Sequence, residues 1–517
     1  MILALGAWAL WPPRDAARAA RVGSGSDHDR RGGAAAAAAV KHVIRFHPGS
    51  MYLPGVVPEN ARRPVEGIAR VGKKFEQLFP DTRVEFIGVP VRSREWLVSQ
   101  LAAGQAPDVI NVNVEDVWQD VQKNWYVALD DYLAAPNPFV RAGEPGSDKW
   151  FDMFKYPVPT RGTTAPDGHM YCIPLDMVET GIYYNKDVFR RLNLSEPRDW
   201  SEFLALQQKL KSAGYVPLLV DRQCLADWGL DLAFYQMYGD LRELLDLNYD
   251  PRRGDYLHGY LDLDEILFLH RKGFFKPTDP RWREVFRVLK EWRPYMSKDL
   301  NASSDMFRSF ATQRGAMYWM HSMVVPRLVR DPDRTFEFGI FYLPPISRSY
   351  SRFARGAEQC VIGGSGSQYN VTNSAYRDTG DPRTSERLKR VVAFLQFLTL
   401  PENCDAVVNE QIAMLPNIKG VEPHRELEPF DRFLRQRYAM TKWFFSFDLR
   451  FGEVLLRMLE LYLNGGMSEA EFFARMERNL QAASETLVRR KSLDLERYEK
   501  VWAEREPLRR PVSELPR

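Results

Sequence analysis

An alternation of strand-like and helix-like segments, which begins near Val40, narrows the folds open to this chain more than any other feature. Apolar residues alternate with polar ones in the strand-like segments and recur every three or four residues in the helix-like segments. Strands joined by helices predict a parallel, doubly wound α/β sheet, because each helical connection carries the chain back to start the next strand in the same direction. We expect strands at 40–48, 82–89 and 107–114, and helices at 66–81 and 93–104.

A second group of α/β segments follows later in the chain. Asp199 and Glu202 have the spacing of an N-terminal capping box for a helix at 200–214, and 215–220 has the pattern of a strand. Residues 387–401 place their apolar side chains on one stripe of a helix. A chain of 517 residues is too long for one compact core, so we expect at least two domains.

The composition gives no reason to expect a polyanionic partner. The formal net charge is only +3, so we expect no binding to nucleic acid. The 13 Trp and 22 Tyr suit a site that recognises flat apolar faces with polar rims. The cysteines are scattered, so a zinc site is not expected, and whether any of them pair stays open. They are Cys172, Cys224, Cys360 and Cys404.

The first residues resemble part of an export signal. Residues 2–11 form an apolar run with the length of a signal-peptide core, too short to span a bilayer. No basic residue precedes the run, so it is either a signal remnant or the result of a misplaced start. The Ala, Gly and Arg bias of 12–39 leaves little to bury and predicts a disordered linker. We therefore treat 1–39 as signal remnant and linker, and 506–517 as a C-terminal tail.

Five segments resemble, in the right order, the bacterial extracellular solute-binding proteins of the sugar-binding type (family 1), which serve ABC importers. The closest match is 171–218, which follows the family's order of Ile-Pro, Tyr-Asn-Lys-Asp-x-Phe, Trp-x-Glu-Phe and Pro-Leu. The resemblance runs from about Val40 to about Leu487. The other four segments are "LAAGQAPDVINVNVEDVW", "WYVALDDYL", "FRSFATQRGAMYWM" and "QIAMLPN".

This resemblance implies a two-lobed α/β fold, in which two doubly wound sheets are joined by a multi-strand hinge and a ligand lies in the cleft. The chain would cross between the lobes near Pro174, near Pro344 and once more after Leu400. Lobe one would comprise 40–175 plus 346–405, and lobe two 176–345 plus 406–505.

Two carboxylates, Asp176 and Glu179, lie where the resemblance places the exit from lobe one. We expect them to face the mouth of the cleft, since a carboxylate can accept two sugar hydroxyls at once. The alternatives are that Asp176 caps a turn and that Glu179 is solvated. A further interpretation is that the same two carboxylates are the catalytic acid and base of a glycoside hydrolase.

More ligand contacts are expected at the carboxyl ends of strands, where open α/β sheets place their ligands. His47 follows the first strand, and Glu115, with Asp116 in reserve, follows the third. Trp228 is the first choice for an aromatic plate beneath a sugar ring, and Trp319 is the second, with core packing as its alternative. The expected ligand-binding set is His47, Glu115, Asp116, Asp176, Glu179, Trp228, Trp319 and His321.

No cofactor or metal ion is expected. Residues 246–257 have the acidic spacing of an EF-hand loop, but Pro251 and Leu257 occupy the positions of its Gly and Glu, so calcium binding stays open and outside the site. The glycine-rich stretch 360–372 lacks the Gly-Lys-Ser/Thr of a phosphate loop.

The expected function is that of the substrate-binding component of an ABC importer, without enzymatic activity. Ligand contacts from both lobes would favour a closed state that a membrane-embedded permease recognises. The ligand would be a mono- or oligosaccharide whose identity the sequence does not give. We expect a monomer that is periplasmic or extracellular and associated with the cell surface. A glycoside hydrolase using Asp176 and Glu179 stays open, as does a two-lobed binding protein for a peptide, polyamine or metal chelate.

Overall fold

The computed structural model divides the chain into two compact units. Unit 1 comprises Met1–Val178 and Ser365–Leu427, and unit 2 comprises Glu179–Gly364 and Glu428–Arg517. The chain therefore passes from one unit to the other three times. The structure describes residues 39–58, 63–89, 94–113, 116–117, 120–156, 165, 167–249, 261, 263–300, 303–354, 364–434 and 449–505.

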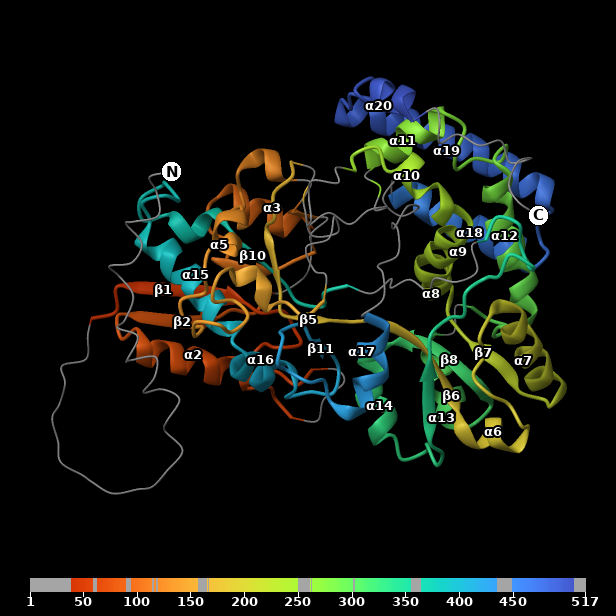
Figure 1. The fold of residues 1–517 in the computed structure, drawn as a ribbon, viewed down its shortest axis with the longest axis horizontal. Helices are drawn as coiled ribbons and strands as arrows, with labels where there is room; N and C mark the ends of the chain where they lie inside the picture. The colour runs from red at the N-terminus through yellow and green to blue at the C-terminus, as the bar shows by residue number, and fades with distance from the viewer. Residues whose placement is uncertain are drawn as a thin grey trace. The chain divides into compact units, whose positions relative to one another are not determined.

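Unit 1 is built on a five-stranded sheet with the order β2-β1-β3-β10-β4 (Figure 1). β1 runs parallel to β2 and β3, as the alternating pattern predicts, whereas β10 is antiparallel to both β3 and β4. A short ladder pairs β11 with β5. The strands of unit 1 are β1 (His42–His47), β2 (Thr82–Phe86), β3 (Val109–Asn111), β4 (Cys172–Pro174), β5 (Asp176–Met177), β10 (Gln368–Val371) and β11 (Leu415–Pro416). Its helices are α2 (Gly67–Leu78), α3 (Arg94–Ala102), α5 (Asp130–Ala134), α15 (Glu386–Leu398) and α16 (Pro401–Val408).

Two apolar clusters pack this sheet. The first is aromatic: Phe394 of α15 packs edge-on against Phe46 of β1 at 5.8 Å and Phe75 of α2 at 5.2 Å between ring centroids. The second joins Leu101 of α3 to Ile110 of β3. The helical stripe predicted at 387–401 is thus confirmed, because α15 is buried along most of its length.

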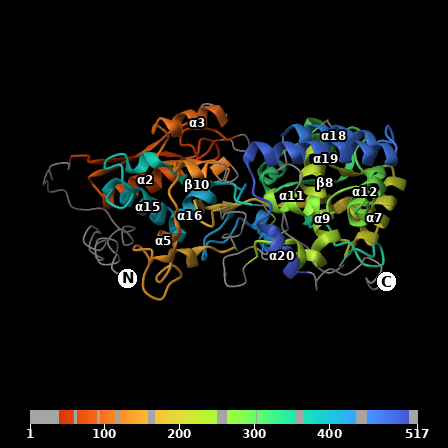
Figure 2. The same cartoon turned by 90° about the horizontal axis from the view of Figure 1, so that it is seen from above.

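Unit 2 contains a four-stranded sheet with the order β7-β8-β6-β9, in which β7 is parallel to β8 and β6 is antiparallel to β8 and β9. The helices α18 and α19 lie side by side in this unit (Figure 2). Its strands are β6 (Thr180–Asn185), β7 (Val216–Leu219), β8 (Gly315–His321) and β9 (Phe338–Phe341). Its helices are α6 (Lys186–Arg191), α7 (Trp200–Ser212), α8 (Arg222–Cys224), α9 (Leu230–Tyr238), α10 (Arg242–Leu245), α11 (Leu263–Arg271), α12 (Pro280–Trp292), α13 (Ser303–Ala311), α14 (Val325–Arg330), α17 (Glu428–Leu434), α18 (Leu449–Leu463), α19 (Glu469–Lys491) and α20 (Tyr498–Glu504).

The predicted cap of α7 is present in a modified form. The Asp199 carboxylate accepts the backbone N–H of Glu202 at 2.9 Å, which satisfies one of the unpaired donors at the helix start. The Glu202 carboxylate accepts the N–H of Arg198 at 2.9 Å, one residue before the position that a capping box requires.

The boundaries of the units differ from those expected from the sequence. The segment after Pro344 stays with unit 2, where the Ile346 N–H donates to Gln236 at 3.0 Å. The segment after 405 stays with unit 1, because β11 pairs with β5 there. Both boundaries are decided by contacts between segments far apart in the chain. The position of a proline in the sequence does not reveal these contacts.

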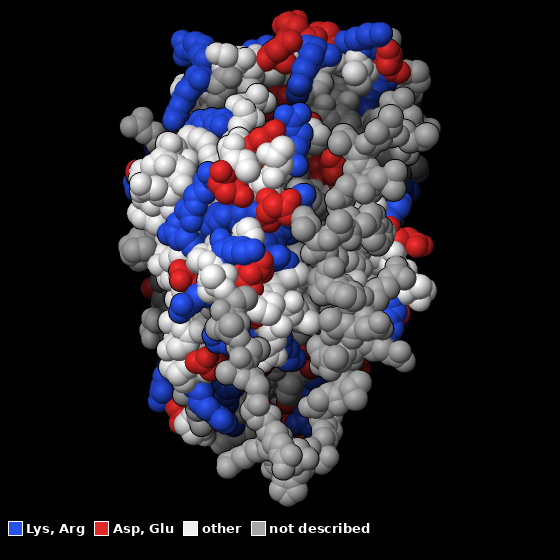
Figure 3. Space-filling model, turned by 90° about the vertical axis from the view of Figure 1, so that its left-hand side faces the viewer, with Lys and Arg blue, Asp and Glu red and all other residues white. Residues whose placement is uncertain are grey.

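Charged side chains of both signs lie on the face of unit 1 that Figure 3 shows. Lys and Arg gather near the middle of the face shown in Figure 3, with Asp and Glu beside them. This mixture agrees with the small net charge of +3. Within the described residues no single helix has the length and apolar content to cross a membrane, although α15 and α16, bent by 76°, meet that test as a pair.

A buried ion pair fastens the late part of unit 1 to its early part. The Arg387 guanidinium donates to both oxygens of Asp108, at 2.7 and 2.5 Å, and to the carbonyl of Val43 at 2.7 Å. The backbone N–H of Arg45 donates to the same carboxylate at 2.7 Å. Burial raises the pKa of Asp108, and the Arg387 charge opposes that rise.

We expect Arg387→Ala to lower the free energy of unfolding of unit 1 by about 3–5 kcal/mol, because it leaves the Asp108 charge buried without its partner. Urea unfolding followed by circular dichroism measures the change. Arg383→Ala is the matched control, since Arg383 pairs with Asp381 at the surface and exposed pairs contribute little. Equal effects of the two substitutions would contradict this role of Asp108 and Arg387.

We expect the partly buried imidazole of His270 on α11 to make the stability of unit 2 depend on pH. Burial, followed by the nearby Lys276 charge, lowers the pKa of His270 to about 4. The unfolded chain takes up this proton near pH 6.5, so stability present at neutral pH is lost as pH falls from about 6.5 to 4. The loss reaches about 3 kcal/mol once the pH is below both pKa values. Unfolding titrations at pH 7 and pH 4.5 should show a smaller difference for His270→Gln than for the unaltered protein.

Candidate binding site

A cavity of about 270 Å³ opens in unit 1 at the carboxyl ends of β1 and β3. This is the edge where α/β sheets place their ligands. Two of the predicted residues meet here, since His47 ends β1 and Asp116 follows β3. The remaining polar and aromatic lining comes from Arg94, Trp96, Asn111, Asn113 and Gly366.

Close backbone packing shapes the wall of this cavity. Gly49 has φ +81, a left-handed conformation that favours glycine. A Cβ at Gly49 would lie 2.1 Å from Nδ2 of Asn111, so any side chain here would displace that amide. The side-chain oxygen of Asn111 accepts the backbone N–H of Gln368 at 2.9 Å, which orients the Asn111 amide at the cavity edge.

His47 is held in a defined orientation. Its Nδ1 donates to the carbonyl of Ile87 at 2.8 Å, so the neutral ring carries its proton on that nitrogen. The ring is nearly buried, with 7% of the residue exposed. A fixed imidazole of this kind can take part in oriented hydrogen bonding.

The charges around the cavity compensate one another. The Arg94 guanidinium binds both oxygens of the buried Asp120, at 2.5 and 2.8 Å. This hydrogen bonding raises the pKa of Arg94, and Asp116 adds to the rise. The cavity therefore combines amides, an imidazole, an indole and the Asp116 carboxylate with a guanidinium that is already paired.

A second group of predicted residues meets in unit 2, near the end of β8. Trp228 is partly exposed, and its ring centroid lies 5.9 Å from that of Trp319 and 6.1 Å from that of His321. Trp228 lies on a π-helical turn, Leu225–Gly229, a rare element found often at functional sites. The backbone carbonyl of Glu179 accepts the N–H of Ser322, so Glu179 lies beside this group.

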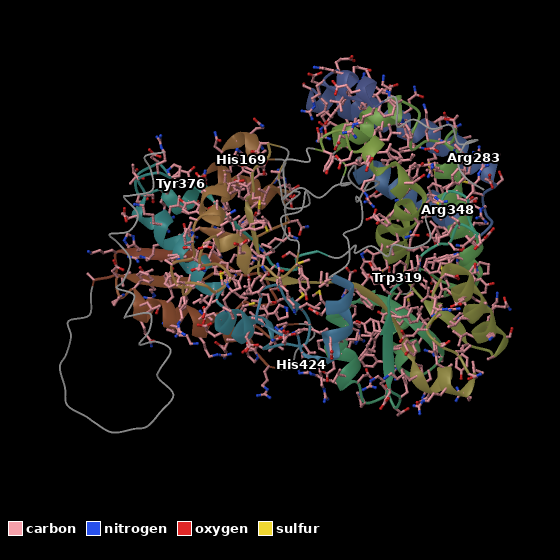
Figure 4. All side chains as sticks on the ribbon, viewed as in Figure 1. His169, Arg283, Trp319, Arg348, Tyr376 and His424 are labelled. Carbon is pink, nitrogen blue, oxygen red and sulfur yellow. The ribbon has the colours of Figure 1, made fainter. Side chains whose placement is uncertain are left out.

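Trp319 belongs to the core of unit 2. It is 1% exposed, and its ring packs against that of Trp292 at 5.7 Å. Figure 4 labels its position on β8. Its prediction as a ligand contact is therefore corrected to the core-strand alternative, since β8 lies between β7 and β6 in the sheet.

Asp176 and Glu179 do not face solvent, contrary to expectation, because both are fully buried. One Asp176 oxygen accepts the N–H groups of Gly366 at 3.1 Å and Ser367 at 2.7 Å, and the other accepts the Tyr52 hydroxyl. Glu179 accepts the N–H of Thr180 at 2.7 Å and the Tyr342 hydroxyl at 3.4 Å. Burial raises the pKa of Asp176, and these hydrogen bonds oppose the rise.

Some predicted features cannot be placed. Glu115 lies outside the described residues, as do Asp250, Pro251 and Leu257 of the EF-hand-like stretch and Cys360. Among the residues that the structure does describe, no group of three or more His, Cys, Asp or Glu could hold a metal ion. The other cysteines, Cys172, Cys224 and Cys404, are buried.

Sequence reasoning missed Trp96, Arg94, Asn111, Asn113 and Gly366. Trp96 stands in the first turn of α3, the helix that follows β2. Trp96 could have been predicted, because it is an aromatic residue at the start of a helix beside the carboxyl ends of strands. The two asparagines could not have been predicted, because they lie within the apolar strand pattern of 107–114.

A family model described as "Bacterial extracellular solute-binding protein" matches residues 63–403. The chain belongs to this family. The match covers more than half of the chain and includes the residues around Trp228 and the lining of the unit 1 cavity except His47. Its description places the family outside the cell, and the family acts by binding solutes.

The individual relatives have low sequence identity to this chain. A multiple sugar-binding protein of Streptococcus mutans is 26% identical over 150 residues, which is 29% of this chain and 32% of that protein. The apo form of RafE from Streptococcus pneumoniae has a TM-score of 0.59 at 18% identity, over 85% of this chain and 98% of its own. RafE in complex with raffinose has a TM-score of 0.55 at 18% identity, over 86% and 98%. These likenesses show the two-lobed α/β fold of the solute-binding proteins.

We expect Trp319→Ala to lower the free energy of unfolding by about 3–5 kcal/mol, since it leaves a large cavity in the core of unit 2. Trp228→Ala should cost less, because that ring is partly exposed. Urea unfolding of the two variants measures the difference. A larger loss for Trp228→Ala would contradict the assignment of Trp319 to the core.

Proposed function

We propose that this chain is the substrate-binding component of an ABC importer and that it captures a mono- or oligosaccharide. The observation that carries the proposal is the cavity at the carboxyl ends of β1 and β3. It is lined by the indole of Trp96, by the Asn111 amide, whose oxygen accepts the N–H of Gln368, and by Asn113. A sugar ring has an apolar C–H face and a rim of hydroxyls, which these groups complement.

The partner half of the site is proposed on unit 2. Trp228 would supply a second plate and His321 a polar contact beside it. A saccharide that contacts both groups of residues would favour a closed state, which the permease would then recognise. The protein would act as an extracellular or periplasmic monomer associated with the cell surface and would deliver its ligand to a membrane-embedded permease.

The alternatives fit the described residues less well. A polyamine or metal chelate needs uncompensated charge, whereas Arg94 is paired with Asp120 within the cavity wall. A glycoside hydrolase would need Asp176 exposed to substrate, and both oxygens of that carboxylate are bound by Tyr52, Gly366 and Ser367. We therefore propose binding without covalent chemistry.

A thermal-shift screen of raffinose, maltotriose, chitotriose and galactose, with spermidine and a dipeptide as controls, tests the proposal. A saccharide that binds only the folded protein should raise the melting temperature, with a stabilisation of about 2.7 kcal/mol at a hundredfold excess over Kd. Mass spectrometry should recover that saccharide unchanged. Stabilisation by spermidine or the dipeptide alone, or turnover of the sugar, would contradict the proposal.

For the saccharide that binds, Trp96→Ala and Trp228→Ala should each weaken affinity by about 2 kcal/mol or more, the range of interface hot spots. Titration calorimetry measures the loss. Trp125→Ala is the matched control for Trp96→Ala, because both rings pack against the same apolar cluster and only Trp96 lines the cavity. Unaltered affinity in both site variants would remove them from the site.

A further inference from the structure

Asp176 is the point where three parts of unit 1 meet. It lies on β5, two residues before the chain leaves unit 1 at Val178. The N–H groups that it accepts belong to Gly366 and Ser367, just after the chain returns at Ser365. Its other oxygen accepts the hydroxyl of Tyr52, from the loop that follows β1.

Two of these three parts also contribute to the cavity or touch its wall. Gly366 lines the cavity directly. The loop that holds Tyr52 begins after His47 and presses Gly49 against Asn111. The carbonyl of Pro48 in that loop accepts the hydroxyl of Tyr369, which lies on β10.

The Asp176 carboxylate is closely packed against Gly366 and Met414. A Cβ added at Gly366 would lie 2.5 Å from the Met414 methyl group and 3.1 Å from the Asp176 Oδ1. Met414 immediately precedes β11, which pairs with Asp176 and Met177 through Leu415 and Pro416. The carboxylate is therefore enclosed by the segments that it bonds to.

We propose that Asp176 is a positioning residue whose carboxylate fastens the loop after β1 and the start of β10 to β5, and so holds the cavity of unit 1 in its binding geometry. This rests on the proposed function for the role of the cavity. Asp176 does not touch the saccharide. It acts through Gly366 and through Tyr52, and it ties the cavity wall to the chain segments that lead into and out of unit 2.

The first test needs no ligand. In Asp176→Asn the amide keeps the shape of the carboxylate but loses the charge that strengthens its hydrogen bonds. Hydrogen–deuterium exchange of the full chain should become at least tenfold faster at 48–53 and at 365–368, with α15 unchanged. Asp187→Asn, at a surface ion pair with Arg190, is the control and should alter neither segment. Faster exchange throughout unit 1, or in only one of the two segments, would overturn the proposal.

A spectroscopic signature separates positioning from general stability. With ¹⁵N-glycine labelling, the Gly366 amide proton should shift upfield in Asp176→Asn, since it loses a carboxylate acceptor. The Gly366 resonance should keep its position in Asp187→Asn. If Asp176→Asn does not fold, the Tyr52→Phe variant decides, because it should speed exchange at 48–53 while the Gly366 amide keeps its chemical shift. An unchanged Gly366 amide shift in folded Asp176→Asn, or unchanged exchange at 48–53 in Tyr52→Phe, would overturn the proposal.

Raffinose affinity supplies the functional arm. We expect Asp176→Asn to bind raffinose at least tenfold more weakly than the unaltered protein, with Asp187→Asn unaffected. Equal raffinose affinity of Asp176→Asn and the unaltered protein would overturn the proposal. If the unaltered protein does not bind raffinose, the exchange and resonance experiments still decide the positioning role, because neither contains a saccharide. Failure of the proposed function is thereby distinguishable from failure of this inference.

Discussion

The buried pair of Asp108 and Arg387 is the interaction on which unit 1 depends, because it joins residues 279 positions apart in the chain. A chain that leaves a domain and later returns must recognise its own earlier segment. Apolar burial alone tolerates sliding, whereas a bidentate guanidinium–carboxylate pair fixes both position and orientation. The same carboxylate accepts the N–H of Arg45, and the same guanidinium reaches the carbonyls of Val43 and Ser374. With the returning segment fixed in this way, β10 can lie antiparallel between β3 and β4 and supply Gly366 to the cavity.

The regular elements of the fold could be predicted from the sequence with good fidelity, because they depend on local periodicity. The three parallel strands and the helices between them follow the predicted pattern, and so does the helix capped by Asp199. The insertion of β10 could not be predicted, since it depends on contacts with residues far away in the chain. The same limit applies to the unit boundaries at 364 and 427, which are decided by pairing of late segments such as β11.

Site residues could be predicted where the strand order alone determines their position. They could not be predicted where the role of a side chain depends on whether it is buried. His47 and Asp116 meet because both follow parallel strands of one sheet. Trp228 and His321 meet for a less local reason, the packing of the π-helical turn against β8. Asp176 shows the opposite case. A carboxylate near the point where the chain leaves a unit can contact a ligand or can have a structural role. Only the positions of Tyr52, Gly366 and Ser367 distinguish the two roles.

The burial of Asp176 bears on how a binding protein can hold a neutral ligand without reacting with it. A carboxylate exposed in a cleft could act as an acid, a base or a nucleophile toward a glycosidic bond. Here its charge is directed to backbone N–H groups and a tyrosine behind the cavity wall, while Asn111, Asn113 and Trp96 line the cavity itself. Amides and indoles accept, donate and stack but do not transfer protons at neutral pH. The lining also includes His47 and Asp116, but Asp176 lies behind this wall, so its charge can organise the cavity without reaching the glycosidic bond of the saccharide that we propose as the ligand.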